Sequence, residues 1–217
     1  MRIISANLWC YNPWQKKAIA KLWQLNADIL VLQEVKPSLV NWLREYALQR
    51  NFTFIQVATN KQMTLCILSR FPISHSEIID SENFAGRPQI KVELDSGITV
   101  FGLHLMAPIT LKKSALRNRQ LEQLAKLINQ ETNPVIAIGD FNTDIKESAF
   151  KKLMAQTNNC SHGRDSFPGK KSWLSVFPLF AIDHLIFTDH FHLASFVVGK
   201  LIWSDHLPII ADISLRN

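Results

Sequence analysis

Polar side chains that can bind metal ions or move protons stand at the ends of apolar, strand-like runs. A strand end is a rigid position, and a carboxylate buried there without a partner would be costly. Any one of these residues alone is more often structural, as a turn former, a strand cap or a buried histidine. Together they favour a shared site, and the set consists of Asn7, Glu34, His104, Asp140, Asn142, Asp183, His184, Asp205 and His206.

The residue types indicate metal-assisted chemistry on a phosphate. Glu34 and Asp205, with the amide oxygen of Asn7, are hard oxygen donors that suit Mg²⁺ or Mn²⁺. The sequence has no second histidine at the helical spacing of a zinc motif, and it lacks the serine-esterase, P-loop and dinucleotide-binding patterns. A metal ion beside histidines and an Asp–Asn pair suits attack of water on phosphorus, because the ion neutralises phosphoryl charge and the histidines stabilise the oxyanion.

Length and composition point to one folded unit. The chain has 217 residues, of which 47% are hydrophobic, so we expect a single monomeric domain over residues 1–217. This composition excludes a disordered chain, and 7 glycines and 9 prolines exclude collagen-like and low-complexity classes. Lys and Arg number 24 against 18 Asp and Glu, and the net charge of +6 is compatible with a phosphate-bearing partner.

Signals for compartment are sparse. The cysteines Cys10, Cys66 and Cys160 stand at no metal-like spacing, and Cys66 lies in an apolar run typical of a buried thiol. No apolar stretch reaches the roughly 18 residues of a transmembrane segment. The chain opens with the strand-like run Met1–Ile4, which leaves no room for a signal peptide. These features predict a cytoplasmic protein.

Short runs rich in β-branched residues are separated by amphipathic stretches. The expected strands are Arg2–Leu8, Asp28–Gln33, Phe52–Ala58, Thr64–Ser69, Gln89–Leu94, Ile98–His104, Pro134–Gly139, Ile182–Phe187, Leu193–Val198 and Pro208–Ser214. The expected helices are Trp14–Leu25, Ser38–Arg50, Leu111–Gln130 and Glu147–Gln156. So many strands exclude a simple βα alternation, and we expect an α+β fold of two packed sheets with helices outside. The segment Thr157–Ser172 reads as a loop with a basic excess.

Several segments, taken together, resemble the endonuclease/exonuclease/phosphatase superfamily of DNase I-like, metal-dependent phosphodiesterases. They occur in that family's order and are SAN at 5–7, LQEV at 32–35, GLH at 102–104, IGDFN at 138–142, IDH at 182–184 and SDHLP at 204–208. The helix around Arg117–Leu121 resembles a branch of small bacterial members. The resemblance implies a four-layer αββα sandwich of two mixed sheets flanked by helices, with the site at one edge.

The resemblance also implies a role for each carboxylate and amide. Glu34 would hold the metal ion, Mg²⁺ or Mn²⁺, aided by Asn7 and Asp205. Asp140 would orient or deprotonate the attacking water. Asn142 would fix both Asp140 and a phosphate oxygen.

The histidines take their implied roles from the same resemblance. His206, oriented by Asp183, would hydrogen-bond the phosphoryl oxygen that gains charge. His104 would contact the same group from the other side.

The resemblance and the basic charge together favour a nuclease acting on DNA. Arg87, Arg117 and Trp203 are candidates for substrate contact, and Trp203 stands where its ring could stack on a base or sugar. Basic clusters at 112–119 and 151–171 also favour nucleic acid. The alternative is a phosphatase or phosphodiesterase for a small phosphorylated metabolite or a phospholipid headgroup. A non-catalytic binding module is a third hypothesis, which the intact set of site residues disfavours.

Overall fold

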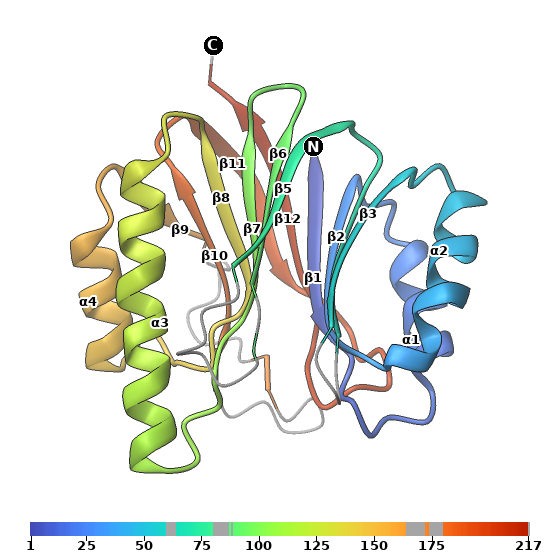
Figure 1. Cartoon of the computed structure of the whole chain (residues 1–217), viewed down its shortest axis with the longest axis horizontal. Coiled ribbons are helices and arrows are strands. Elements are labelled where there is room, and N and C mark those ends of the chain that lie inside the picture. Colours follow the sequence, from blue (N-terminus) through green and yellow to red (C-terminus); the bar gives the residue numbers. More distant parts are fainter. Residues whose placement is uncertain (60–63, 80–86, 88, 164–171, 174–179, 217) are drawn as a thin grey trace.

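The computed structural model describes residues 1–59, 64–79, 87, 89–163, 172–173 and 180–216. Two six-stranded sheets pack face to face, and helices cover the outer face of each sheet (Figure 1). This is the α+β sandwich that the sequence predicts. Within the described ranges, no helix is long and apolar enough to cross a membrane.

The first sheet has the strand order β11-β12-β1-β2-β4-β3. Its centre is the parallel pair β1 and β2, and every other neighbouring pair is antiparallel. The central strands are almost entirely buried, as expected for strands that are covered on both faces. The strand bounds are β1 Arg2–Asn7, β2 Ile29–Val35, β3 Phe54–Thr59, β4 Thr64–Ser69, β11 Phe191–Val198 and β12 Ile209–Leu215.

The second sheet repeats this plan with the order β5-β6-β7-β8-β10-β9. The parallel pair β7 and β8 lies at its centre, and the remaining pairs are antiparallel. Both sheets are therefore mixed. In each sheet, the predicted site residues stand at or near the C-terminal ends of the two parallel strands. The strand bounds are β5 Ile73–Ile79, β6 Gln89–Leu94, β7 Thr99–His104, β8 Val135–Asp140, β9 Cys160–His162 and β10 Asp183–Thr188.

Helices cover the outer faces because each has one apolar side. In α3, Leu121, Leu124 and Ile128 recur at helical spacing and are buried, and Thr110 caps the start by accepting a hydrogen bond from the amide of Lys113. Figure 1 shows α1 and α2 against the first sheet and α3 and α4 against the second. The helix bounds are α1 Gln15–Trp23, α2 Val40–Leu48 after a 3-10 turn at Pro37–Leu39, α3 Leu111–Gln130 and α4 Ser148–Gln156.

Three apolar layers hold these four layers of structure together. Side chains of both sheets, including Val31, Val100 and Ile138, form the middle layer. The two outer layers join each sheet to its helices, with Leu32 and Leu22 on one side. The same arrangement on the other side joins α3 and α4 to the second sheet.

Two strands of the structure are not predicted by the sequence. β5 carries four consecutive polar residues, 74–77, and is largely exposed, because it is an edge strand held by its backbone pairing with β6. β9 occupies the start of the segment 157–172, where a loop is expected, and pairs with β10. Residues 164–171 of that segment, and of the predicted basic cluster 151–171, lie outside the described residues.

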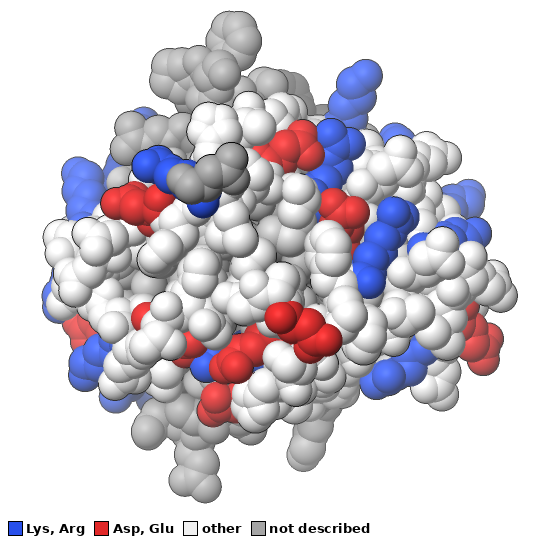
Figure 2. Space-filling view, turned by 90° about the horizontal axis from the view of Figure 1, so that it is seen from above, with Lys and Arg blue, Asp and Glu red and all other residues white. Residues whose placement is uncertain are grey.

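Acidic and basic side chains are interspersed on the face seen in Figure 2, which is the end of the sandwich that carries the N-terminus. The C-terminal ends of β1 and β2 lie at the opposite end. Charge therefore does not mark this N-terminal face as the place where a polyanion would dock.

Gly139 should be intolerant of any side chain. A Cβ there would lie 2.1 Å from the carbonyl oxygen of Leu103, and the φ of +149° disfavours L residues. We expect Gly139→Ala to lower the free energy of unfolding by about 3 kcal/mol or more, measured by urea denaturation. Gly97→Ala is the matched control, because its φ is +75° but no atom lies within 4 Å, so only backbone strain of about 1 kcal/mol is expected. Equal losses in the two variants would contradict this.

Candidate active site

Strand register brings three of the predicted residues side by side on the second sheet. His104 ends β7 directly beside Asp140, which ends β8, and Asp140 is in turn paired with Asp183 at the start of β10. Residues paired in this way project from the same face of a sheet. All three side chains are buried. The sheet thus places one histidine and two carboxylates in a row.

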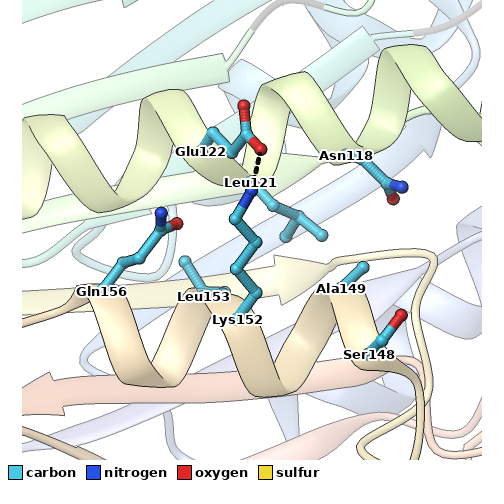
Figure 3. A pocket seen from close by; sticks show the side chains of 8 residues that line it. All are labelled: Asn118, Leu121, Glu122, Ser148, Ala149, Lys152, Leu153 and Gln156. Atoms are coloured by element: carbon cyan, nitrogen blue, oxygen red, sulfur yellow. Dashed lines mark hydrogen bonds and ion pairs between the residues drawn. The ribbon is translucent and has the colours of Figure 1, made fainter.

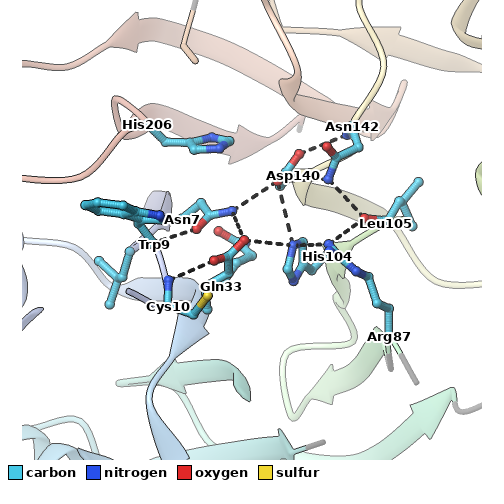
Figure 4. A network of polar contacts seen from close by, with 12 residues as sticks. Asn7, Trp9, Cys10, Gln33, Arg87, His104, Leu105, Asp140, Asn142 and His206 are labelled. Atoms are coloured by element: carbon cyan, nitrogen blue, oxygen red, sulfur yellow. Dashed lines mark hydrogen bonds and ion pairs between the residues drawn. The ribbon is translucent and has the colours of Figure 1, made fainter. Parts of the chain in front are cut away.

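Asn7 links this row to the first sheet. It ends β1, and its Nδ2 donates to Asp140 Oδ2 and to Glu34 Oε1, both at 3.1 Å (Figure 4). Its Oδ1 accepts the amide of Trp9 at 3.0 Å, so the amide nitrogen, and not the oxygen, faces the carboxylates. Metal binding through Oδ1, as the sequence predicts, requires this amide to rotate by half a turn.

Glu34 projects into the site from an irregularity in β2. The pairing of β2 with β4 shifts between Leu32 and Val35, and Glu34 has a left-handed φ of +57°. Bulges of this kind re-aim side chains and are common next to active sites. Its Oε2 accepts the amide of Cys10 at 2.8 Å, and its Oε1 lies 3.5 Å from His104 Nε2.

Glu34 keeps its charge in this setting. Burial alone would raise the pKa of its carboxyl group. Hydrogen bonding and charge attraction from His104, together with the amides of Cys10 and Asn7, outweigh burial and hold that pKa well below its usual range. The group is therefore an anion throughout the physiological range.

Asp140 is held by the residue two positions along the chain. Its Oδ1 accepts the Asn142 amide at 2.9 Å, and its Oδ2 accepts Asn142 Nδ2 at 3.1 Å. Burial, with a contribution from Asp183, raises the pKa of the Asp140 carboxyl group against the lowering effect of His206 and His104. A carboxylate whose pKa is raised is a better proton acceptor, which suits a general base.

His206 and Asp183 form a buried ion pair. His206 Nδ1 lies 2.8 Å from Asp183 Oδ2, and both side chains are almost inaccessible. Burial alone would lower the pKa of His206, but the carboxylates of Asp183, Asp140 and Asp205 outweigh it and raise that pKa to about 10. The ring is therefore a cation whose Nδ1 proton is fixed by Asp183.

Asp205 lies beside the same cluster. Burial, and then the charge of Glu34, raises the pKa of its carboxyl group, with His206 opposing. The preceding Ser204 fixes the segment by donating its Oγ to the carbonyl oxygen of Asn7 at 2.6 Å. Nothing in the sequence distinguishes Ser204 from its neighbours beyond its place in the SDHLP segment.

The three residues predicted to contact substrate differ in position. Arg87 reaches the site, where its Nη1 donates to the carbonyl oxygen of Leu105 at 3.0 Å and lies within hydrogen-bond distance of His104 Nε2. Trp203 lies on the surface two positions before Asp205 and is 48% exposed. Contact of either residue with a substrate stays a prediction.

Arg117, the third candidate for substrate contact, lies inside the protein. It is 2% exposed, and its guanidinium donates to the Asn142 carbonyl oxygen at 2.7 Å and to Glu147 Oε2 at 2.9 Å. These partners compensate the burial of its charge. The side chain thus braces the turn that carries Asn142 from behind, and Asn142 itself has a left-handed φ of +49°.

His184 is a second brace that its sequence position did not reveal. Its Nε2 donates to the carbonyl oxygen of Thr143 at 2.7 Å, next to Asn142. Burial lowers the pKa of this histidine, so its ring is neutral. The sequence groups it with the site residues, but its ring faces the turn behind them.

A pocket of about 150 Å³ lies elsewhere, between α3 and α4 (Figure 3). The ion pair of Lys152 with Glu122, at 2.5 Å, spans it. None of the predicted site residues lines this pocket. It therefore adds nothing to the chemistry of the cluster around Asp140.

Comparison with known proteins agrees with this geometry. The pattern of the Endonuclease/Exonuclease/phosphatase family matches residues 4–206. The chain belongs to this family. No curated protein sequence matches it. Membership of the endonuclease/exonuclease/phosphatase family makes the chain a phosphoric ester hydrolase by kind.

Solved structures of family members share the fold. The endonuclease/exonuclease/phosphatase from Beutenbergia cavernae DSM 12333 has a TM-score of 0.84 at 16% identity, covering 99% of this chain and 71% of that chain. The 3'-5' exonuclease (NExo) from Neisseria meningitidis has a TM-score of 0.76 at 15% identity, covering 98% and 99%. D. rerio TDP2 complexed with single strand DNA product has a TM-score of 0.73 at 17% identity, covering 99% and 98%.

Members of the endonuclease/exonuclease/phosphatase family generally use divalent metal ions, and the donors of this site fit such an ion. Burial and repulsion from neighbouring carboxylates raise the pKa values of Asp140 and Asp205. A bound divalent cation would stabilise the ionised form of both carboxylates. Ligand atoms of Asp140, Asp183 and His206 also lie within 4.8 Å of one another. However, Asp183 and His206 already satisfy each other, so Glu34 and Asp205 are the more available ligands.

The Asp183–His206 pair should stabilise the protein in a pH-dependent way. The folded-state pKa of His206, about 10, lies above its ordinary value of 6.5. The stability from this pair is therefore fully present below about pH 6.5 and is lost as the pH rises through about 10. We expect Asp183→Asn to lower the free energy of unfolding more at pH 6 than above pH 10, by urea denaturation. A loss that does not change with pH would contradict this.

Proposed function

We propose that the protein is a divalent-metal-dependent phosphodiester hydrolase, and that it acts as a nuclease on DNA. The observation that carries the proposal is the convergence of Glu34 and Asp140, one from each sheet, with His206 from the segment before β12, each already held by its own partner. Glu34 thereby offers an anion to a metal ion, Asp140 offers a base to a water molecule, and His206 offers a cation to a phosphoryl oxygen. Such preorganised charges are what attack of water on phosphorus needs.

Asp140 is the residue suited to orient and deprotonate the water. Its pKa is raised by burial, and it is held by hydrogen bonds from the amide and side chain of Asn142 and from Asn7. These donors fix the carboxylate while leaving it acceptor capacity for a water molecule. Arg117 and His184, from behind, keep the turn that carries Asn142 in place.

His206 is suited to bind the phosphoryl oxygen that gains charge. Its Nδ1 is occupied by Asp183, so the Nε2–H is the donor left for a substrate. Because the ring is a cation up to a pH of about 10, this bond is charge-assisted. His104, which ends β7 and has Arg87 beside it, would contact the same phosphoryl group from the other side.

Glu34 and Asp205, with Asn7 after rotation of its amide, would hold Mg²⁺ or Mn²⁺. When bound, the cation supplies neutralisation of the phosphoryl charge. Glu34 suits this role because its pKa stays low, so that it offers an anionic oxygen without needing to lose a proton first.

Two further observations support DNA as the substrate. The net charge is +6, although four acids are gathered at the site. Among structures of the same fold, D. rerio TDP2 is complexed with single strand DNA product, and a 3' phosphatase, NExo from Neisseria, is bound to a product DNA hairpin. The +6 charge and these complexes favour a polymeric phosphodiester over a small phosphorylated metabolite.

Replacing the proposed base should abolish turnover without unfolding the protein. We expect Asp140→Asn to lower kcat by about 10³-fold, within the usual range for loss of a general base. The matched control is Asp95→Asn, because Asp95 is exposed in the turn between β6 and β7, and its kcat should equal that of the parent. Circular dichroism checks that both variants are folded. Turnover retained in Asp140→Asn would overturn the assigned role.

The substrate class is tested by salt and by metal removal. We expect cleavage of single- or double-stranded DNA with Mg²⁺ or Mn²⁺, lost with EDTA and restored by adding the ion. Because binding of a polyanion releases counterions, KM for DNA should rise steeply with salt, while KM for a chromogenic diester should not. Hydrolysis of the diester without salt-sensitive binding of DNA would refute the nucleic-acid part and favour a small phosphoester.

A further inference from the structure

Two tryptophans, one directly before α1 and one two positions before Asp205, are about half exposed, which is unusual for so large an apolar ring. Trp14, immediately before α1, is 51% exposed, and Trp203 is 48% exposed. Trp203 also has a left-handed φ of +59°, a conformation that only a few per cent of residues other than glycine adopt. Core packing therefore explains the position of neither ring.

Lysine side chains connect these rings. Lys17 Nζ lies 4.2 Å from the ring centroid of Trp14, and Lys21 Nζ lies 4.7 Å from that of Trp203. Lys17 and Lys21 are four residues apart on α1, so they are neighbours on one face of the helix. The contacts place these side chains in the order Trp14, Lys17, Lys21 and Trp203, and we call the four the aromatic–lysine strip. Lys21 is partly buried, and its Nζ also donates to the carbonyl oxygen of Leu201 at 2.8 Å, which fixes the ammonium group beside Trp203 and leaves it two further N–H donors.

The strip ends at the proposed metal ligands. Trp203 is followed by Ser204, which donates to the carbonyl oxygen of Asn7 at 2.6 Å, and then by Asp205. A third indole, that of Trp9, lies beside Asn7 (Figure 4) and is 40% exposed. The Trp203 end of the strip therefore adjoins the carboxylate cluster.

The combination of two aromatic rings with two ammonium groups between them identifies the kind of ligand. Single-stranded nucleic acid offers base faces that stack on aromatic rings and phosphates that pair with cations, at intervals along one chain. A duplex hides its base faces. A lipid surface suits a continuous apolar loop with its cations at the margin, whereas here the lysines lie between the rings.

We propose that the aromatic–lysine strip binds single-stranded nucleic acid and directs it to the carboxylate cluster, with bases stacked on Trp14 and Trp203 and phosphates paired with Lys17 and Lys21. This rests on the proposed function, because it names the form of the polymer that the same site would cleave. It also assigns to α1 a binding role that the fold alone does not require.

Binding can be measured apart from turnover in an Asp140→Asn background with Mg²⁺, by fluorescence anisotropy of a labelled 12-nucleotide single strand and of the matching duplex. We expect Trp14→Ala and Trp203→Ala each to weaken single-strand binding about tenfold. Lys17→Ala/Lys21→Ala should reduce the slope of log affinity against log salt by about 1.4, the value for loss of two phosphate contacts. The matched controls are Phe71→Ala and Lys126→Ala, which lie outside the strip and should bind like the background protein.

The outcomes separate this proposal from the one on which it rests. Single-strand binding that is unaffected by the strip variants, or tighter binding of the duplex, overturns the strip. Loss of binding to vesicles of phosphatidylglycerol and phosphatidylcholine in the Trp variants, with single-strand binding intact, overturns it in favour of a lipid surface. Failure of the parent to hydrolyse any phosphodiester, with single-strand binding that depends on the strip, refutes the proposed function alone.

Discussion

Like charges gathered inside the protein are the constraint on which the site depends. Glu34, Asp140, Asp183 and Asp205 lie in one partly or fully buried region, where carboxylates repel one another and lose hydration. The chain offsets this with hydrogen-bond donors and with positive charge. The amide of Asn7 bridges two of the carboxylates, and His206 as an imidazolium pairs with a third. Affinity for a divalent cation and for a phosphoryl group follows from the same arrangement, since both supply what a crowded anionic site lacks.

This arrangement can exist only where the two sheets meet. Asn7 belongs to the first sheet and Asp140 to the second, so their hydrogen bond forms only when the sandwich is packed. Left-handed backbone at Glu34 and Asn142 aims the side chains, and this strain persists because the bulge in β2 and the braces behind Asn142 hold it. Fold stability and site geometry are therefore coupled.

The sequence predicted the sheets, the helices and the cluster because each leaves a local pattern. The helix Leu111–Gln130 has the bounds that the sequence predicts, since its apolar spacing is a local signal. The edge strand β5 leaves no such pattern, because it is held by backbone hydrogen bonds and buries few side chains. The braces were harder to predict. The burial of Arg117 and the turn of His184 toward Thr143 depend on contacts between residues distant in sequence, which no periodicity records.

The most direct test of the central claim is calorimetric titration of Mn²⁺ into the parent protein and into Glu34→Gln. If the carboxylate cluster is a divalent-metal site, the parent binds the ion and Glu34→Gln binds it about tenfold or more weakly, as expected for loss of a ligand group. Glu45→Gln, at an exposed position on α2, should bind like the parent. A parent that does not bind Mn²⁺, or a Glu34→Gln variant that binds as tightly as Glu45→Gln, would contradict the account.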